Sequence, residues 1–176
     1  MRLYGYWRSG AAYRLRIAYA MKGLAYEAVP INLLTGAQRS AAFLAPNPPV
    51  LVPARELDNG AVLTQSLSIL DWLERSYPTP PLLPADAVAR AQEMAAGMAI
   101  AVDTHPVQNV CFVNYLKSAY GSDTQGPPSG SVTGWTAAPT PVFPLAISPD
   151  MPTSARPCQA LPAFDAARRK NQPDAT

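Results

Sequence analysis

Net charge and cysteine are both scarce in this sequence of 176 residues, and each scarcity excludes a class of function. The formal net charge is only +2, which is too small to indicate binding to nucleic acid or to an acidic membrane surface. The two cysteines, Cys111 and Cys158, are too few for a disulfide framework or a metal cluster. They fit a reducing environment, so we expect a cytoplasmic protein.

Long apolar runs are also missing. No stretch approaches the roughly 18 apolar residues that indicate a membrane-spanning helix. The start of the chain does not resemble a signal peptide, because arginines interrupt each apolar run there: Arg2, Arg8, Arg14 and Arg16. We therefore expect no membrane partner.

Proline is abundant and unevenly distributed. Of the 20 prolines, ten precede residue 121 and ten fall in the last 55 residues. Proline breaks helices and central strands. Residues 122–160 are also rich in Gly, Ser, Thr and Ala, and we predict that they are irregular or disordered.

The first third of the chain predicts a strand–helix–strand unit. Arg2–Trp7 is short and rich in aromatic residues, which is typical of a buried strand. Apolar residues recur at helical spacing over Ala11–Lys22, and Gly23 stands where a helix C-terminal cap belongs. Leu24–Asn32 alternates enough to form a second strand, so the three segments predict a βαβ unit.

A hairpin and a further helix follow. Gln38–Leu44 is compatible with a short helix, and Val50–Leu57 with a strand that contains a proline. Asn59-Gly60 predicts a tight turn before a return strand at Ala61–Thr64. Ser66 is the expected cap of a helix that continues to Tyr77.

A linker then separates two predicted domains. Pro78–Pro84 holds four prolines, and Asp86 is placed to cap a long helix from Val88 to about Tyr120, kinked at Pro106. The predicted fold class is α+β. It comprises a domain over residues 1–80 and a helical domain over residues 88–176 that is regular only to about residue 121.

The same segments carry a family resemblance. The motifs are Tyr6-Trp7-Arg8-Ser9, Tyr13-Arg14-Leu15-Arg16-Ile17-Ala18, Val52-Pro53, Leu63-Thr64-Gln65-Ser66, Pro81-Leu82-Leu83-Pro84, His105-Pro106-Val107-Gln108-Asn109 and Gln172-Pro173-Asp174. Together they resemble zeta-class glutathione transferases, the maleylacetoacetate and maleylpyruvate isomerases. The likeness covers residues 1–121 and about 160–176.

The resemblance implies a thioredoxin-like domain followed by an all-helical domain, with glutathione as the cofactor and a homodimer as the assembly. It implies isomerisation of maleylacetoacetate, a cis-dicarboxylic keto acid of tyrosine and phenylalanine breakdown. Three alternatives stay open: a maleylpyruvate isomerase, a general glutathione transferase, and a glutathione-binding protein that is catalytically defective.

This chemistry needs a thiolate, which is the nucleophilic form of a thiol. Ser9 stands between the first strand and the first helix, where its hydroxyl can donate to a thiolate. The helix N-terminus adds favourable potential there. The plainer interpretation of Ser9 is a helix cap. Gly10 takes the place of a serine that the family often has, so backbone N–H groups must supply that part of the site. Arg8 is a candidate for a substrate carboxylate, or else a surface arginine.

The remaining site candidates follow from the resemblance. Val52-Pro53 matches a loop in which a cis proline leaves the preceding backbone free to pair with glutathione. The residues alone are equally compatible with an edge-strand proline. Gln65-Ser66 opens a helix suited to the γ-glutamyl carboxylate. Gln38, His105 and Asn109 match polar positions near glutathione, and for His105 we expect hydrogen bonding rather than general-base work. Arg14 is a possible structural ion-pair partner.

The sequence departs from the family after residue 121. The family's later helices, including an arginine that binds substrate carboxylates, have no counterpart between Ser122 and Pro157. A deletion with a shifted reading frame would explain both this gap and the family-like tail that follows it. Translating the source DNA in its other frames should then recover the missing helices.

Overall fold

The computed structural model describes residues 1–45 and 47–109, together with 112, 114–115 and 118. The prediction that residues 122–160 are irregular lies outside these residues, as does most of the predicted helical domain.

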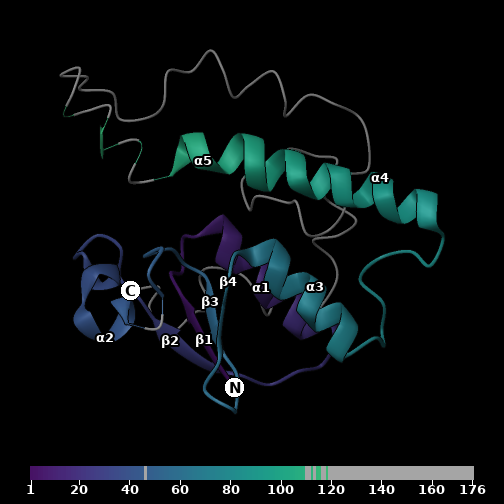
Figure 1. Ribbon diagram of the computed structural model, residues 1–176, viewed down its shortest axis with the longest axis horizontal. Coiled ribbons are helices and arrows are strands. Elements are labelled where there is room, and N and C mark those ends of the chain that lie inside the picture. Colours follow the sequence, from purple (N-terminus) through teal and green to yellow (C-terminus); the bar gives the residue numbers. More distant parts are fainter. Residues whose placement is uncertain (46, 110–111, 113, 116–117, 119–176) are drawn as a thin grey trace.

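A mixed four-stranded sheet forms the centre of the first domain, in the order β2-β1-β3-β4 (Figure 1). The strands are β1 (Arg2–Gly5), β2 (Glu27–Pro30), β3 (Ala54–Glu56) and β4 (Val62–Thr64). The pair β1 and β2 is parallel, whereas β1 with β3 and β3 with β4 are antiparallel. This is the predicted βαβ unit followed by a hairpin, with shorter strands than the sequence pattern indicated.

Two helices cover one face of the sheet and a short one lies on the other (Figure 1). Helices α1 (Gly10–Met21) and α3 (Ser66–Ser76) share a core with β1 that includes Leu3, Leu15 and Ile69. The opposite face packs Phe43 of α2 (Ala41–Leu44) against Ile31 and Ala54. A 3₁₀ turn, η1 (Ala37–Arg39), precedes α2.

The end of α1 confirms the predicted glycine cap. Gly23 has φ +63°, a conformation that costs glycine little. The Leu24 N–H donates to the Tyr19 carbonyl at 2.9 Å and the Gly23 N–H donates to the Ala20 carbonyl at 3.2 Å. These two bonds form a Schellman motif, which satisfies two carbonyls at the end of the helix.

The linker after α3 is fixed by a buried ion pair. Lys22 Nζ lies 3.0 Å from Glu74 Oε2, and their side chains are 0% and 10% exposed. Lys22 also donates to the carbonyls of Tyr77 and Pro80. Glu74 in turn accepts from the Leu82 N–H at 2.9 Å. One buried pair therefore connects the ends of α1 and α3 to the chain that leaves the first domain.

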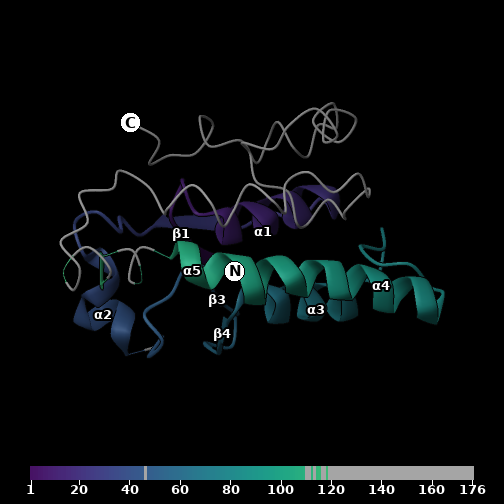
Figure 2. The same cartoon turned by 90° about the horizontal axis from the view of Figure 1, so that it is seen from above.

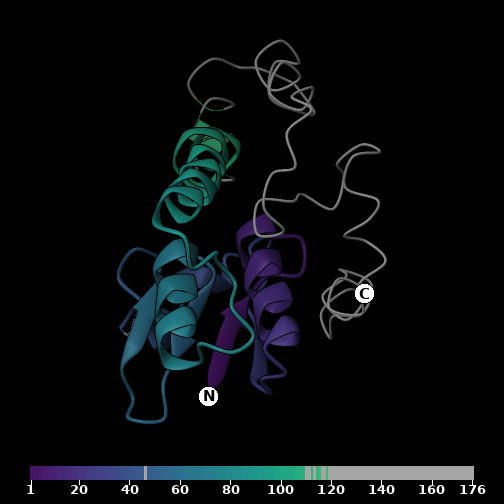
Figure 3. The same ribbon diagram turned by 90° about the vertical axis from the view of Figure 1, so that its right-hand side faces the viewer.

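The next helix is shorter than the sequence predicted. Asp86 caps α4 (Ala87–Met98) as expected, and accepts from the N–H groups of Val88 and Ala89. A π-helical segment, η2 (Ala99–Thr104), and a final turn, α5 (His105–Gln108), follow. Together, α4, η2 and α5 form one rod that runs alongside α3 (Figures 2 and 3).

The prediction of one helix from Val88 to about Tyr120 is wrong at Asn109, which has extended backbone, φ −65° and ψ 140°. The predicted disturbance at Pro106 is present as the wider turns of η2. Proline has no N–H for the helical ladder, so the hydrogen bonds before it rearrange. In the described part of the chain, no helix has both the length and the apolar character needed to cross a membrane.

Candidate active site

The candidate residues gather at one end of the sheet, as its register shows. Gly5, the last residue of β1, is paired with Pro30. Tyr4 is paired with Ala54, the first residue of β3, and Ala54 with Thr64, the last residue of β4. The segments that continue from this row are the loop to Ser9, the Val52-Pro53 dipeptide and Gln65. The topology therefore brings three separately predicted motifs to the same end of the sheet, which we call the sheet edge.

Ser9 is the N-terminal cap of α1, and its hydroxyl keeps its proton available. Its Oγ accepts from the Ala12 N–H at 3.2 Å, and its own N–H donates to the Tyr6 carbonyl at 3.0 Å. Because the oxygen is the acceptor in the cap, the hydroxyl hydrogen can be donated to another group. The cap and a donor role are thus compatible in one side chain.

Arg8 precedes this cap and is exposed, with its guanidinium carbon 5.7 Å from the centre of the Trp7 ring. Its role toward a substrate carboxylate stays a prediction.

The peptide bond between Val52 and Pro53 is cis, as the motif predicted. Among the described residues, Val52 takes part in no backbone–backbone hydrogen bond, and Pro53 is buried beside it. An extended ligand could therefore pair with the main chain of Val52 as an added strand. Gln38 lies in η1, where its Oε1 is buried with no partner in the described part of the chain.

The start of α3 differs from the prediction by one residue. Gln65, rather than Ser66, is the N-cap, with φ +66°, ψ 115° and no side-chain cap bond. Ser66 is the first helical residue, and it is only 7% exposed. Gln65 forms no side-chain cap bond, so within the described part of the chain the first N–H groups of α3 are available to a negatively charged ligand.

Arg14 brings the starts of α3 and α5 together, which the sequence did not indicate. Its Nη1 donates to Ser66 Oγ at 3.1 Å, and its Nη2 lies 2.9 Å from His105 Nδ1. The expectation that Arg14 is an ion-pair partner is wrong within the described residues, where it contacts no carboxylate. Burial lowers the pKa of Arg14 to about 10, so it remains cationic at neutral pH.

His105 is the only histidine and packs against the start of α1. A Cβ atom on Gly10 would lie 3.4 Å from its Cε1 and Nε2. Burial and the charge of Arg14 lower the pKa of His105 to about 4. The imidazole is therefore neutral at physiological pH, in line with the hydrogen-bonding role expected from sequence. Asn109 follows α5, and its N–H donates to the Pro106 carbonyl at 3.3 Å.

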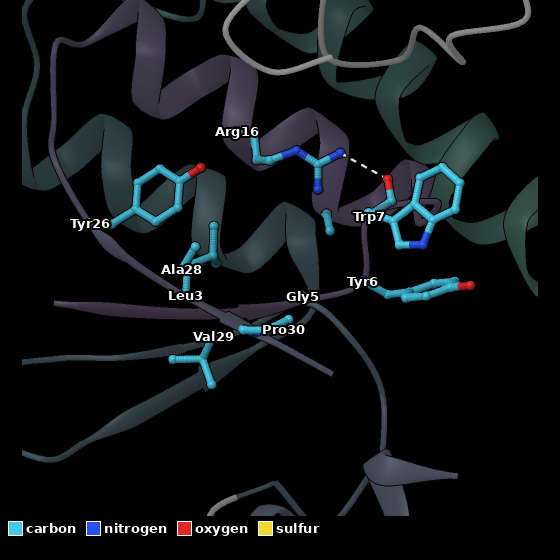
Figure 4. A pocket seen from close by; sticks show the side chains of 10 residues that line it. Leu3, Gly5, Tyr6, Trp7, Arg16, Tyr26, Ala28, Val29 and Pro30 are labelled. Atoms are coloured by element: carbon cyan, nitrogen blue, oxygen red, sulfur yellow. Dashed lines mark hydrogen bonds between the residues drawn. The ribbon is translucent and has the colours of Figure 1, made fainter. Parts of the chain in front are cut away.

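A pocket between α1, β1 and β2 is separate from these residues (Figure 4). The Arg16 guanidinium donates across it to the Trp7 carbonyl at 3.2 Å. Tyr6, Tyr26 and Val29 are among its lining residues, and none of the sequence-predicted site residues is. The candidate active site is therefore the sheet edge described above.

Comparisons with known proteins identify the family of this chain. Residues 3–81 match the family model of the glutathione S-transferase N-terminal domain. A maleylpyruvate isomerase from Ralstonia sp is 41% identical over 180 residues, covering 96% of this chain and 83% of its own length. This chain belongs to the zeta-class glutathione transferases, the family of maleylpyruvate and maleylacetoacetate isomerases.

The likeness extends to other members of the zeta class, over part of the length for one relative and over the full length for two solved structures. A maleylacetoacetate isomerase from Pseudomonas aeruginosa is 42% identical, and this chain spans 59% of its length. A solved zeta-class maleylpyruvate isomerase has a TM-score of 0.81 at 31% identity, with both chains covered completely. The maleylacetoacetate isomerase of Methylobacterium extorquens AM1, solved with malonate and glutathione, has a TM-score of 0.83 at 31% identity and the same coverage. The predicted fold, a thioredoxin-like domain followed by helices, is confirmed.

The contact between Gly10 and His105 predicts a steric limit at the start of α1 in this zeta-class protein. Gly10→Ala should be tolerated because its Cβ would meet His105 at van der Waals distance. Gly10→Leu should displace the ring, since the additional atoms would occupy its position. Glutathione affinity measured by calorimetry should then stay within about twofold for alanine and fall about tenfold for leucine. Equal affinities of the two variants would contradict this packing.

The low pKa of His105 predicts a pH-dependent stability. The folded-state pKa of about 4 lies below the ordinary value of 6.5, so the folded protein resists protonation of the ring. This contribution is complete above about pH 6.5 and is lost as the pH falls toward 4. For a partly exposed ring we expect about 2 kcal/mol.

Urea denaturation at pH 7 and pH 4 should show this difference between the wild type and His105→Asn. Arg14 is the charged side chain that contacts the ring, and Ser66 beside it does not titrate. If both proteins lose the same stability between the two pH values, the ring is not protected as described.

Proposed function

We propose that this chain is a glutathione-dependent cis–trans isomerase whose substrate is maleylpyruvate. The observation that carries the proposal is the likeness to the Ralstonia maleylpyruvate isomerase along 96% of the chain. The likeness to the P. aeruginosa maleylacetoacetate isomerase covers 71%. This corrects the preference for maleylacetoacetate in the sequence analysis, since the more complete match is to the alternative.

The described residues fit glutathione, an extended tripeptide with two carboxylates. Val52, beside a cis proline, offers a main chain that has no backbone hydrogen bond to any residue the structure describes. The start of α3 offers uncapped N–H groups at Gln65 and Ser66, suited to the γ-glutamyl carboxylate. The buried Oε1 of Gln38 provides one more acceptor without a partner in the described part of the chain.

Glutathione, when bound, would supply a thiolate nucleophile for reversible addition to the cis double bond. The role we assign to Ser9 is to donate a hydrogen bond to the sulfur from the N-terminus of α1. Gly10 contributes its backbone N–H at the same helix end. Arg8 binds a substrate carboxylate from its exposed position. His105 and Asn109 add polar contacts from the start and end of α5.

A turnover assay tests the proposal. The purified chain is incubated with glutathione and either maleylpyruvate or maleylacetone, an analogue of maleylacetoacetate, and loss of the cis-enone absorbance is followed. We expect kcat/KM to be about tenfold higher for maleylpyruvate, because one differing contact in a binding pocket can discriminate between substrates by about this factor. Faster turnover of maleylacetone than of maleylpyruvate would instead indicate maleylacetoacetate as the substrate.

That second candidate, maleylacetoacetate, has its own support in the M. extorquens isomerase with bound malonate and glutathione. Retention on glutathione resin without turnover of either compound would instead favour a binding protein. Failure of both turnover and retention would overturn the proposal. A homodimer is also part of the proposal, and analytical ultracentrifugation should give twice the mass of one chain.

A further inference from the structure

Arg14 is unusually placed for a buried cation. It belongs to α1, and its two terminal nitrogens reach α3 and α5, at positions 52 and 91 residues away in sequence. Only 2% of the residue is exposed, and its Nε has no partner among the described residues. The groups that do accept from it, Ser66 and His105, are uncharged.

A buried cation without a counter-charge is costly unless an anion approaches it. Two helix N-termini lie beside Arg14. One is the start of α1, where Gly10 contacts His105, and the other is the start of α3 at Ser66. Helix N-termini also favour negative charge. The guanidinium and both helix starts thus create positive potential where the γ-glutamyl carboxylate is proposed to bind.

The direction of the hydrogen bonds adds a second consequence. Arginine only donates, so Ser66 Oγ is the acceptor and the hydroxyl proton is free for another partner. His105 accepts in the same way, and its Nδ1 lies closer to Arg14 Nη2 than its Nε2 does, at 2.9 Å against 3.5 Å. The proton of the neutral ring is then on Nε2, the nitrogen that lies against Gly10.

We propose that Arg14 is a positioning residue of the glutathione site. It turns the Ser66 hydroxyl into a donor for the γ-glutamyl carboxylate, and it holds His105 as the neutral tautomer that donates from Nε2 at the start of α1. This role rests on the proposed function, because it assumes that glutathione occupies the sheet edge. Through these two contacts, Arg14 also connects the thioredoxin-like domain to the helical rod of α4, η2 and α5.

The single histidine provides a direct test that needs no ligand. In protein labelled with ¹⁵N-histidine, the nitrogen shifts should report a ring protonated at Nε2 at pH 7. In Arg14→Met the titration midpoint of His105 should rise by about one pH unit or more, because the neighbouring charge is gone. Arg14→Lys keeps that charge and should stay near the wild type. A ring protonated at Nδ1, or a midpoint unchanged in Arg14→Met, would overturn the assignment.

Glutathione affinity tests the other half of the proposal. By calorimetry, Arg14→Met should raise the Kd about 10- to 100-fold, and Arg14→Lys should fall between it and the wild type. Arg16→Met is the matched control, since Arg16 is 5% exposed on the same helix, and its Kd should stay within about threefold of the wild type. A glutathione analogue that lacks the γ-glutamyl α-carboxylate should bind the wild type and Arg14→Met with similar affinity.

The outcomes separate the two proposals. If the wild type binds no glutathione, the proposed function fails, while the histidine spectrum still reports the contact with Arg14. If the wild type binds glutathione and Arg14→Met binds it equally well, the positioning role is wrong and the proposed function stands. Thermal melting of each variant shows whether it is folded. If Arg14→Met is not folded, Arg14→Lys replaces it in the affinity measurement.

Discussion

Replacing Ser9 with alanine should lower kcat/KM for the maleyl substrate by about 10²- to 10³-fold, the usual effect of removing one donor from a developing or bound anion. The reason is that Ser9 Oγ already accepts from the Ala12 N–H, which leaves its proton for the sulfur. The affinity for glutathione should change less than about tenfold, because its carboxylates and backbone are held elsewhere.

The alternative role of Ser9, a simple helix cap, makes a different prediction. Loss of a cap costs about 1 kcal/mol of stability and leaves the chemistry intact at temperatures well below the melting transition. Titration of the thiolate absorbance of bound glutathione separates the two roles, since only a lost donor raises the pKa of the bound thiol.

Ser9→Thr keeps a hydroxyl and should retain most of the activity. Ser40→Ala removes a serine from another helix N-cap, one that forms no side-chain cap bond, and should behave as wild type. Activity of Ser9→Ala within threefold of the wild type would refute the donor role.

Lys22→Met should destabilise the fold by about 3–5 kcal/mol, because it leaves the carboxylate of Glu74 without its buried cation. Burial by itself raises the pKa of Glu74, but bonds from the Leu82 N–H and from Lys22 outweigh it, and the net pKa is lowered. The carboxylate is therefore charged in the folded protein. Urea denaturation followed by circular dichroism measures the loss.

Removing the unpaired charge of Glu74 as well should recover part of this stability. In Lys22→Met/Glu74→Gln, the amide oxygen can still accept from the Leu82 N–H, but no buried carboxylate is left unpaired. Arg75→Met is the surface control. Its ion pair with Asp71 joins side chains that are 76% and 40% exposed, so we expect a change below about 0.5 kcal/mol. Equal losses in Lys22→Met and Arg75→Met would show that burial of the first pair has no energetic consequence.

The sequence by itself determined the order of the elements in the first domain and several of their ends. Gly23 ends α1 and Asp86 begins α4 as predicted, because caps act within one helical turn. The combined motifs identified the family, and the resemblance implied the cis peptide bond at Val52-Pro53, whereas the two residues alone are equally compatible with an edge-strand proline. Prediction stopped at Asn109, because proline indicates a disturbance at Pro106 but not how the chain leaves the helix.

Only the tertiary structure decided which groups meet at the site. That Arg14 is bonded to Ser66 and to His105, rather than to a carboxylate, depends on how α1, α3 and α5 pack. Contacts across 52 and 91 residues leave no periodicity in the sequence, since they arise from the fit of buried surfaces. The positive φ of Gln65 ahead of α3 likewise could not be predicted locally, because it runs against the conformational preference of a residue that has a Cβ.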